Sequence, residues 1–199
     1  MTTGDAMAAE KARLRAELRR VAEALAPTER WTRSRRLVRA VLESEPWHTA
    51  TAVVGFVGRG AEPDTRPVLE AALATGRPLL LPRVSSRRPP RLSFEAVSDL
   101  GVLEAGTFGI PEPPPGPGAE IPAGALVLVP AVALDAQGGR LGHGMGFYDR
   151  ALADLSGAVT AMGLCLAPFL VSRVPTAGHD VRLDWIATDE GVVRVPQVS

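Results

Sequence analysis

Short apolar segments alternate with helical segments along most of this chain, and this alternation limits the folds that the chain can adopt. Apolar, often β-branched runs or strict alternation predict strands at 51–57, 79–81, 91–97, 125–129 and 159–166. We expect Pro82 to close the second of these strands. Helical spacing of apolar residues predicts helices at 64–75 and 147–155. Because strands that alternate with helices form a mainly parallel sheet covered on both faces, we predict an α/β fold, a three-layer α/β/α sandwich.

The two ends of the chain and one central segment complete the expected organisation. Helices are predicted at 5–26 and, after Pro27, at 28–45, and short strands at 185–187 and 192–195. The proline-rich segment 110–122 reads as a stiff surface connection, because strands of the same kind resume after it. A rigid strap is favoured there over a mobile lid. We therefore expect a single domain over residues 1–199.

A glycine-rich loop follows the apolar run that ends at Val129. Five glycines lie at positions 138, 139, 142, 144 and 146, and the loop then opens into the helix predicted to begin at Phe147. Glycine lets the backbone approach a ligand closely, and a helix start offers free N–H groups and a partial positive charge. Together these features favour an anion, most often a phosphate. Arg140 and Arg150 add positive charge, and Asp149 adds a carboxylate that could hold a metal or simply suit the first turn of its helix.

Lys11 is the only lysine among 22 basic residues. It lies four residues before Arg15, so both side chains share one face of the first predicted helix. An ammonium group is a compact charge suited to a phosphate oxygen. A solvated helix face is the alternative interpretation.

Composition excludes several classes of partner. The formal net charge is zero, which gives no reason to expect nucleic acid or a membrane surface as partner. Cys165 is the single cysteine and lies in an apolar run, so we expect a buried thiol and no internal disulfide. No apolar run is long enough to span a membrane, and the first ten residues do not resemble a signal peptide. A cytoplasmic location is the expectation, as a monomer or weak homo-oligomer.

Two common phosphate-binding motifs do not fit the loop. A Walker A loop needs a Gly-Lys pair that is absent here, and Gly142-His-Gly-Met-Gly146 has the wrong third spacing for a dinucleotide fingerprint. Glycine spacing alone therefore does not identify the ligand.

The longer string Arg140-Leu-Gly-His-Gly-Met-Gly-Phe-Tyr-Asp-Arg150, after Val129-Pro-Ala131, resembles the signature of the 5-formyltetrahydrofolate cyclo-ligase (methenyltetrahydrofolate synthetase) family. Five further segments resemble that family in the same order over about residues 8–193: Lys11-Ala-Arg-Leu-Arg15, Glu62-Pro-Asp-Thr65, Gly76-Arg-Pro-Leu-Leu-Leu-Pro-Arg83, Phe108-Gly-Ile-Pro-Glu-Pro113 and His179-Asp-Val-Arg-Leu-Asp184 followed by Thr188.

The resemblance implies a reaction. Such enzymes use ATP and Mg²⁺ to cyclise 5-formyltetrahydrofolate to 5,10-methenyltetrahydrofolate, with ADP and phosphate as products. The formyl oxygen takes up the γ-phosphoryl group, which turns a poor leaving oxygen into a good one. The protein mainly positions the reactants and neutralises charge.

The resemblance also implies residue roles. Lys11 and Arg15 should contact ATP phosphates, Asp149 and Asp184 should bind Mg²⁺, and Glu62 should accept hydrogen bonds from the pterin. Turn or capping roles are the alternatives for Asp184 and Glu62. We expect Arg140, Tyr148 and Asp149 to act in catalysis. The residues expected to cradle the triphosphate are Arg140, Leu141, Gly142, His143, Gly144, Met145, Gly146, Phe147 and Tyr148, and those from Gly144 to Tyr148 should also border the folate.

Three positions depart from the family pattern. Phe147 replaces a tyrosine and lacks its hydroxyl, Phe169 stands where a glutamine is common, and Leu134 replaces an aromatic residue. His143 is interpreted as a loop-surface residue, and His48 and His179 as structural. None of these changes removes a phosphate-binding or metal-binding group, so we expect catalysis to be retained.

Two other functions remain alternatives. One is a non-catalytic relative that binds reduced folate or nucleotide, although such a protein would not need a pair of magnesium ligands. The other is a sugar-phosphate isomerase or acyl-CoA transferase on a similar scaffold, since fold does not determine function. Dependence on ATP would separate these functions.

Overall fold

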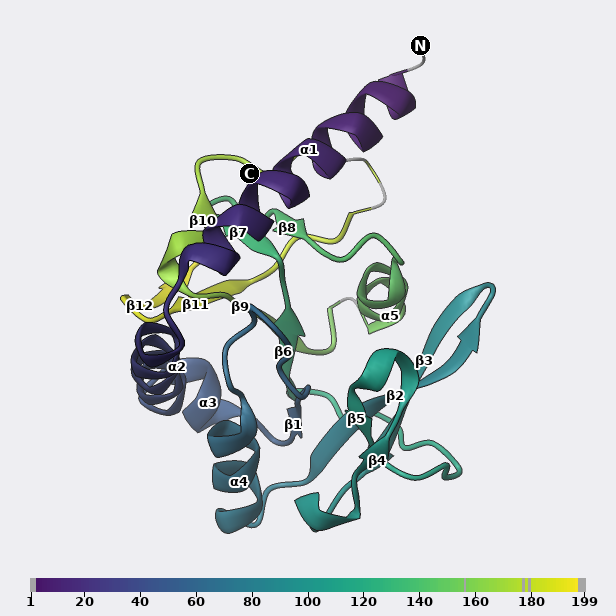
Figure 1. Cartoon of the computed structure of the whole chain (residues 1–199). Helices are drawn as coiled ribbons and strands as arrows, with labels where there is room; N and C mark the ends of the chain where they lie inside the picture. Colours follow the sequence, from purple (N-terminus) through teal and green to yellow (C-terminus); the bar gives the residue numbers. More distant parts are fainter. Residues whose placement is uncertain (1–2, 156, 177, 179, 197–199) are drawn as a thin grey trace.

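The computed structural model describes residues 3–155, 157–176, 178 and 180–196, and it is built on a seven-stranded sheet (Figure 1). The strand order is β12-β11-β9-β6-β1-β2-β3. The five inner strands run parallel, and an antiparallel strand closes each edge. The prediction of a mainly parallel α/β sheet is confirmed.

The helices are α1 (Thr3–Ala24), α2 (Pro27–Leu42), α3 (Glu45–Thr49), α4 (Arg66–Ala74) and α5 (Phe147–Leu155), and three short 3₁₀ turns lie at Leu100–Val102, Thr107–Gly109 and Ala167–Phe169. The strands of the main sheet are β1 (Val53–Val54), β2 (Leu79–Arg87), β3 (Pro90–Ala96), β6 (Leu126–Pro130), β9 (Thr160–Leu164), β11 (Trp185–Thr188) and β12 (Gly191–Arg194). Smaller sheets contain β4 (Glu104–Ala105) with β5 (Pro111–Glu112), and β10 (Leu170–Val171) with β7 (Ala133–Asp135) and β8 (Arg140–Leu141).

Strands β1 and β6, in the middle of the sheet, are apolar along their length because both faces of the sheet are covered there. Leu126, Leu128 and Val129 of β6 have no exposed surface. On one side α2 packs on β11, β12 and α4, while α5 packs on β3. Figure 1 shows α2, α3 and α4 on the opposite side of β6 from α5. Burial on two faces explains why these strands read as continuous apolar runs and not as alternating ones.

The chain reverses its direction across the sheet between β1 and β6. From β1 it proceeds through α4 to β2 on one side, whereas from β6 it proceeds through α5 to β9 on the other. Because crossover connections are right-handed, opposite directions place α4 and α5 on opposite faces. Ligands of open α/β sheets bind beyond the carboxyl ends of the strands at such a reversal.

Strand β2 continues through Pro82, so the prediction that Pro82 ends this strand is wrong. The N–H of Gly55 donates to the carbonyl of Leu80, which therefore faces β1. Pro82, two residues later, faces the same side, where β1 has already ended. The N–H that proline lacks is not needed at this position, because no strand pairs with that edge.

A β-hairpin that the sequence did not predict separates β6 from the glycine loop. Strands β7 and β8 pair antiparallel, and the Asp135 carboxylate accepts bonds from the N–H groups of Gln137, Gly139 and Val174 at 2.9, 2.9 and 2.7 Å. Gly138 and Gly139 therefore form the turn of this hairpin, and Gly142, Gly144 and Gly146 lie in the loop between β8 and α5.

The proline-rich segment is fastened to the body of the protein at several points. The N–H of Ala119 donates to the Phe94 carbonyl at 2.7 Å, and that of Gly118 donates to Glu95 at 3.0 Å. Arg83 donates to the carbonyl of Pro113 at 2.6 Å. These bonds favour a fixed strap over a mobile lid.

None of the described helices combines the length and apolarity required to cross a membrane.

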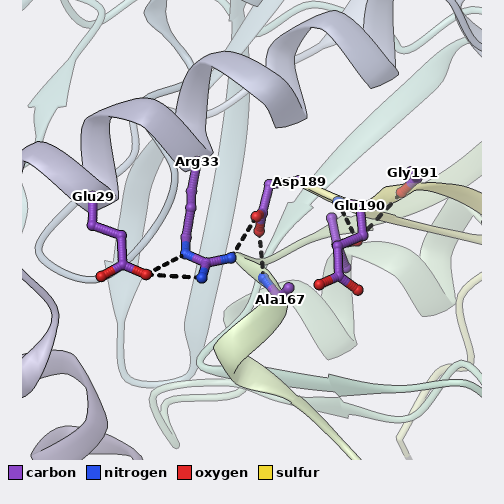
Figure 2. Close-up of polar contacts among 7 residues, drawn as sticks. Glu29, Arg33, Ala167, Asp189, Glu190 and Gly191 are labelled. Atoms are coloured by element: carbon purple, nitrogen blue, oxygen red, sulfur yellow. Dashed lines mark hydrogen bonds and ion pairs between the residues drawn. The ribbon is translucent and has the colours of Figure 1, made fainter.

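A buried carboxylate ties α2 to the carboxyl end of the sheet (Figure 2). Asp189 follows β11, and its side chain is 1% exposed. It accepts bonds from Arg33 of α2 at 2.7 Å and from the N–H of Ala167 at 2.6 Å. Arg33 also pairs with Glu29 at 2.8 Å, and the hydrogen bonds to Glu29 and Asp189 raise the pKa of the Arg33 guanidinium.

Cys165 is buried as predicted, with 1% of its surface exposed, and burial raises the pKa of its thiol to about 12. Because the thiolate is the reactive form, we expect iodoacetamide to leave Cys165 of the native protein unmodified at mildly alkaline pH, and to modify it fully in denaturant. An unfolded thiol ionises near pH 9, so this burial contributes stability that is complete below pH 9 and declines as pH rises toward about 12. Mass spectrometry of the labelled protein checks the expectation, which equal labelling of native and unfolded protein would contradict.

Candidate active site

A cavity of about 800 Å³ lies at the reversal point between β1 and β6. It is lined by Phe56 and Val57, which follow β1, and by Pro130 at the end of β6. Most of the site residues predicted from the sequence line it as well: Lys11, Arg15, Glu62 and every residue from Arg140 to Asp149. Segments far apart in the chain therefore meet where the fold favours ligand binding.

The glycine loop connects β8 to α5, which begins at Phe147 as predicted. Gly144 and Gly146 have φ values of +93° and +72°, in the region that side chains disfavour. A Cβ atom added to Gly142 would lie 2.7 Å from a guanidinium nitrogen of Arg140. Glycine at these positions thus allows the turn and brings the backbone close to Arg140, ahead of the free N–H groups at the start of α5.

Helix α1 brings its two predicted cations to the edge of the cavity. The Lys11 ammonium lies 2.6 Å from the Asp180 carboxylate, and the Nε of Arg15 donates to the Gly142 carbonyl at 2.8 Å. Burial lowers the pKa of Arg15. Asp180 also lines the cavity and was given no role from the sequence, although it belongs to the closing segment with family resemblance. The neighbouring His179, predicted to be structural, lies outside the described residues.

Arg140 and Asp149 form an ion pair in the cavity wall. The Nη2 of Arg140 lies 2.5 Å from Oδ1 of Asp149, and their side chains are 5% and 23% exposed. Arg140 lies in β8 and Asp149 in the first turn of α5, so the pair joins both ends of the glycine loop. Among the described residues the Nε of Arg140 has no hydrogen-bond partner. A buried charged donor without a partner is costly, which favours an anionic ligand at this wall.

Tyr148 places a buried hydroxyl in the same wall. Its oxygen is buried, yet no described residue bonds to it. Burial, and then the negative charge of Glu62, raise the pKa of this hydroxyl, so it stays protonated and can donate. A buried polar group without a partner is costly, which suggests that a ligand provides the partner.

Glu62 lies in the loop after β1 with 8% of its side chain exposed. Its Oε2 accepts the N–H of Arg59 at 2.8 Å, and its Oε1 lies 3.1 Å from Nε2 of His143. His143 is 68% exposed, in agreement with the prediction of a loop-surface residue, but its contact with Glu62 was not predicted. This contact joins the glycine loop to the loop after β1.

The structure does not bring Asp184 to the cavity, and the prediction that it shares a metal with Asp149 needs correction. Asp184 precedes β11, and its carboxylate accepts the N–H of Ala161 near the start of β9 at 2.8 Å. It therefore lies toward the amino ends of the strands, whereas the cavity lies at their carboxyl ends. Within the described ranges, no group of three or more His, Cys, Asp or Glu side chains is arranged to hold a metal. Asp149 is the predicted metal ligand that remains at the site.

The three residues that depart from the family pattern lie in different parts of the fold. Phe147 lines the cavity, so its missing hydroxyl bears on the ligand. Phe169 is 3% exposed and Leu134 fully buried, and neither is among the residues that line the cavity. Their effect is therefore on packing.

The strap adds residues that the sequence analysis did not single out. Ile110 and Glu112 of the strap line the cavity, as does Phe108 just before it. Glu112 is 5% exposed, accepts the N–H of Thr107 at 3.0 Å and lies 3.9 Å from Arg83. The Gly-Ile-Pro-Glu-Pro segment that resembles the family contains Ile110 and Glu112, but the resemblance alone implied no role for either residue.

We expect Gly58→Ala to raise the KM for the substrate that binds in this cavity. The new Cβ would lie 1.9 Å from the carbonyl oxygen of Pro63, so the backbone beside Glu62 must move, at about 1–3 kcal/mol of stability. Gly163→Ala is the matched control, because its Cβ would overlap Leu183 at 2.4 Å in the core, outside the cavity. Steady-state kinetics and denaturant unfolding of both variants test this. An equal change in KM for both would show that Gly58 acts through stability alone.

A sequence model of the 5-formyltetrahydrofolate cyclo-ligase family matches residues 7–189. The chain belongs to this family. Among the enzymes with this family name, that of Mycolicibacterium smegmatis is 34% identical over 146 residues, covering 71% of this chain and 75% of the relative. That of Mus musculus is 24% identical over 187 residues, covering 89% and 92%.

Two solved structures, both of 5,10-methenyltetrahydrofolate synthetases, superpose on this chain. The 5,10-methenyltetrahydrofolate synthetase of Aquifex aeolicus superposes with a TM-score of 0.81 at 27% identity, covering 95% of this chain and 94% of that one. The synthetase of Mycoplasma pneumoniae superposes with a TM-score of 0.68 at 19% identity, which shows the shared fold.

Proposed function

We propose that this chain cyclises 5-formyltetrahydrofolate to 5,10-methenyltetrahydrofolate in a reaction that requires ATP and Mg²⁺. The observation that carries the proposal is the cavity at the reversal of the sheet. There the glycine loop, the Arg140–Asp149 pair and the two cations of α1 line one space, and each of them lies in a segment that resembles the family.

The cations and free N–H groups account for binding of the triphosphate. Arg15 already contacts the glycine loop, and Lys11 lies one turn earlier on the same helix. No residue of the described ranges bonds to the Nε of Arg140, and the start of α5 offers N–H groups. Catalysis of phosphoryl transfer rests mainly on such positioning and charge neutralisation, so no nucleophilic side chain is required.

Asp149 is the residue that we propose to hold Mg²⁺. Magnesium bound with nucleotides uses one or two carboxylates, with phosphate oxygens and waters as its other ligands. One protein carboxylate, that of Asp149, is therefore enough for the ion, which would supply positive charge to the phosphates when bound. In the protein alone, Arg140 supplies the charge that balances Asp149.

Glu62 and Tyr148 are the proposed contacts to the folate. A buried carboxylate accepts paired hydrogen bonds from an aminopyrimidinone edge, and Glu62 is held for this by the N–H of Arg59. The Tyr148 hydroxyl donates a hydrogen bond to the ligand, because no described residue accepts one from it.

Tyr148→Phe is expected to affect stability and activity in opposite directions. Without ligand, loss of an unpartnered buried hydroxyl should leave the free energy of unfolding unchanged or raise it by about 1 kcal/mol. With ligand, the lost hydrogen bond should lower kcat/KM by roughly tenfold. Denaturant unfolding and steady-state kinetics measure the two effects. Parallel losses of stability and activity would mean that the hydroxyl has a structural partner instead.

The function itself is tested by following the absorbance of the methenyl product with purified protein, 5-formyltetrahydrofolate, ATP and Mg²⁺. Product formation that stops when ATP or Mg²⁺ is omitted would support the proposal. Binding of folate or ATP without product would overturn it in favour of a non-catalytic binding protein, and product without ATP would overturn the ATP-dependent reaction.

A further inference from the structure

The β2–β3 hairpin carries a concentration of positive charge beside the cavity. Figure 1 shows that its tip projects beyond the rest of the main sheet. Arg87, Arg88 and Arg91 are exposed there, and residues 84–94 contain no acidic residue. Among the described residues no carboxylate pairs with these three arginines. The tip therefore carries unbalanced charge in a chain whose net charge is zero.

An irregularity in the hairpin decides which way Arg87 faces. Val84 pairs with Leu92, and both line the cavity. Side chains alternate along a strand, so a regular β2 would place Arg87, three residues after Val84, on the opposite face. The register shifts between Val84 and Ser86, and this bulge returns Arg87 to the cavity face, paired with Pro90.

The surroundings of Arg87 agree with this orientation. Its guanidinium carbon lies 5.5 Å from the centre of the Phe108 ring, and Phe108 lines the cavity. Phe108 is 45% exposed and has a φ of 60°, which is uncommon for a residue other than glycine. A guanidinium stacked on a ring keeps its N–H edge available, and that edge matches a carboxylate.

Arg91 has the same charge but the opposite orientation. It pairs with Ser86, one residue before Arg87, and precedes Leu92, which lines the cavity. Alternation along β3 therefore directs Arg91 to the other face of the hairpin. The hairpin thus provides a control that differs from Arg87 in direction and not in charge.

We propose that Arg87 forms a subsite at the outer end of the cavity for the carboxylates of the glutamyl tail of the folate, most strongly when that tail is a chain of γ-linked glutamates. This proposal rests on the proposed function, because it places the tail of that substrate. The cations assigned to the triphosphate, Lys11 and Arg15, belong to α1 and line the cavity, whereas Arg87 lies at the tip of the β2–β3 hairpin against Phe108. The anion at the hairpin is therefore the tail and not the nucleotide.

The test compares KM for monoglutamyl and triglutamyl 5-formyltetrahydrofolate in wild-type protein, Arg87→Gln and Arg91→Gln. We expect wild-type protein and Arg91→Gln to have a lower KM for the triglutamyl form than for the monoglutamyl form. In Arg87→Gln the ratio of the two KM values should fall by about fivefold or more, which is the effect of losing a partly exposed ion pair. The kcat should remain unchanged, and the loss should shrink as salt is raised.

Three outcomes would overturn the subsite. Arg87→Gln and Arg91→Gln could weaken the preference equally, which would indicate general attraction by net charge. Arg87→Gln could raise KM for ATP instead, which would assign the arginine to the nucleotide. Wild-type protein could show equal KM for both folates. Absence of product from either folate with wild-type protein would overturn the proposed function, a result distinct from all three.

Discussion

Replacing Asp149 by asparagine is expected to lower the kcat for methenyl product by about 10²–10³-fold, the size typical of removing one preorganised electrostatic group from an active site. Asparagine keeps the shape of the side chain but removes the charge proposed to hold Mg²⁺. It also leaves Arg140, whose side chain is 5% exposed, without its carboxylate partner. We expect the residual activity to need a higher Mg²⁺ concentration, which a magnesium titration of initial rates measures.

Two other asparagine variants make this experiment specific. Asp154→Asn makes the same chemical change on the same helix, at an exposed position outside the cavity, and should leave kcat and the Mg²⁺ requirement unchanged. Asp184→Asn should lower stability, because its carboxylate accepts the N–H of Ala161, without altering the Mg²⁺ requirement. If Asp184→Asn raised that requirement as much as Asp149→Asn, the assignment of the metal to Asp149 alone would be wrong.

The spacing of apolar residues predicted strands that are buried on both faces and helices whose ends are marked by glycine. The helix at 147–155 matches α5 because glycines end at position 146 and apolar residues follow at helical spacing. Strand β6 is apolar throughout and was found within one residue at each end. The β7–β8 hairpin was missed, since strands of three and two residues are too short for any alternation to be recognised.

The sequence predicted which segments contribute to the candidate site better than it predicted where each side chain lies in the fold. Motif resemblance placed Lys11, Glu62 and the glycine loop correctly at one cavity. It failed for Asp184, because order in the sequence does not tell which edge of the sheet a residue before a strand will face. Asp180, four residues earlier, is the carboxylate of that segment that reaches the cavity. Arg87 depends on a bulge, and a bulge leaves no pattern in the residues themselves.

Asp189→Asn is expected to lower the free energy of unfolding by about 2–3 kcal/mol. Its side chain is 1% exposed and accepts one charged bond from Arg33 and one from the N–H of Ala167 (Figure 2). The amide of asparagine can replace only part of this, since its nitrogen is a donor facing other donors. Arg33 keeps Glu29 and contact with water, so the loss stays below that of a fully isolated charge.

Glu29→Gln removes a charge from the other side of the same arginine and serves as the matched control. Glu29 is 47% exposed and its ion pair joins residues one helical turn apart, so its loss should cost only about 0–1 kcal/mol. Unfolding in guanidinium chloride gives the free energy of unfolding of both single variants and of the double variant. The difference between the double loss and the sum of the single losses measures their coupling through Arg33. Because neither residue lines the cavity, KM for ATP and folate should stay unchanged in both. Equal costs for the two substitutions would show that water reaches Asp189 and that burial does not strengthen its bonds.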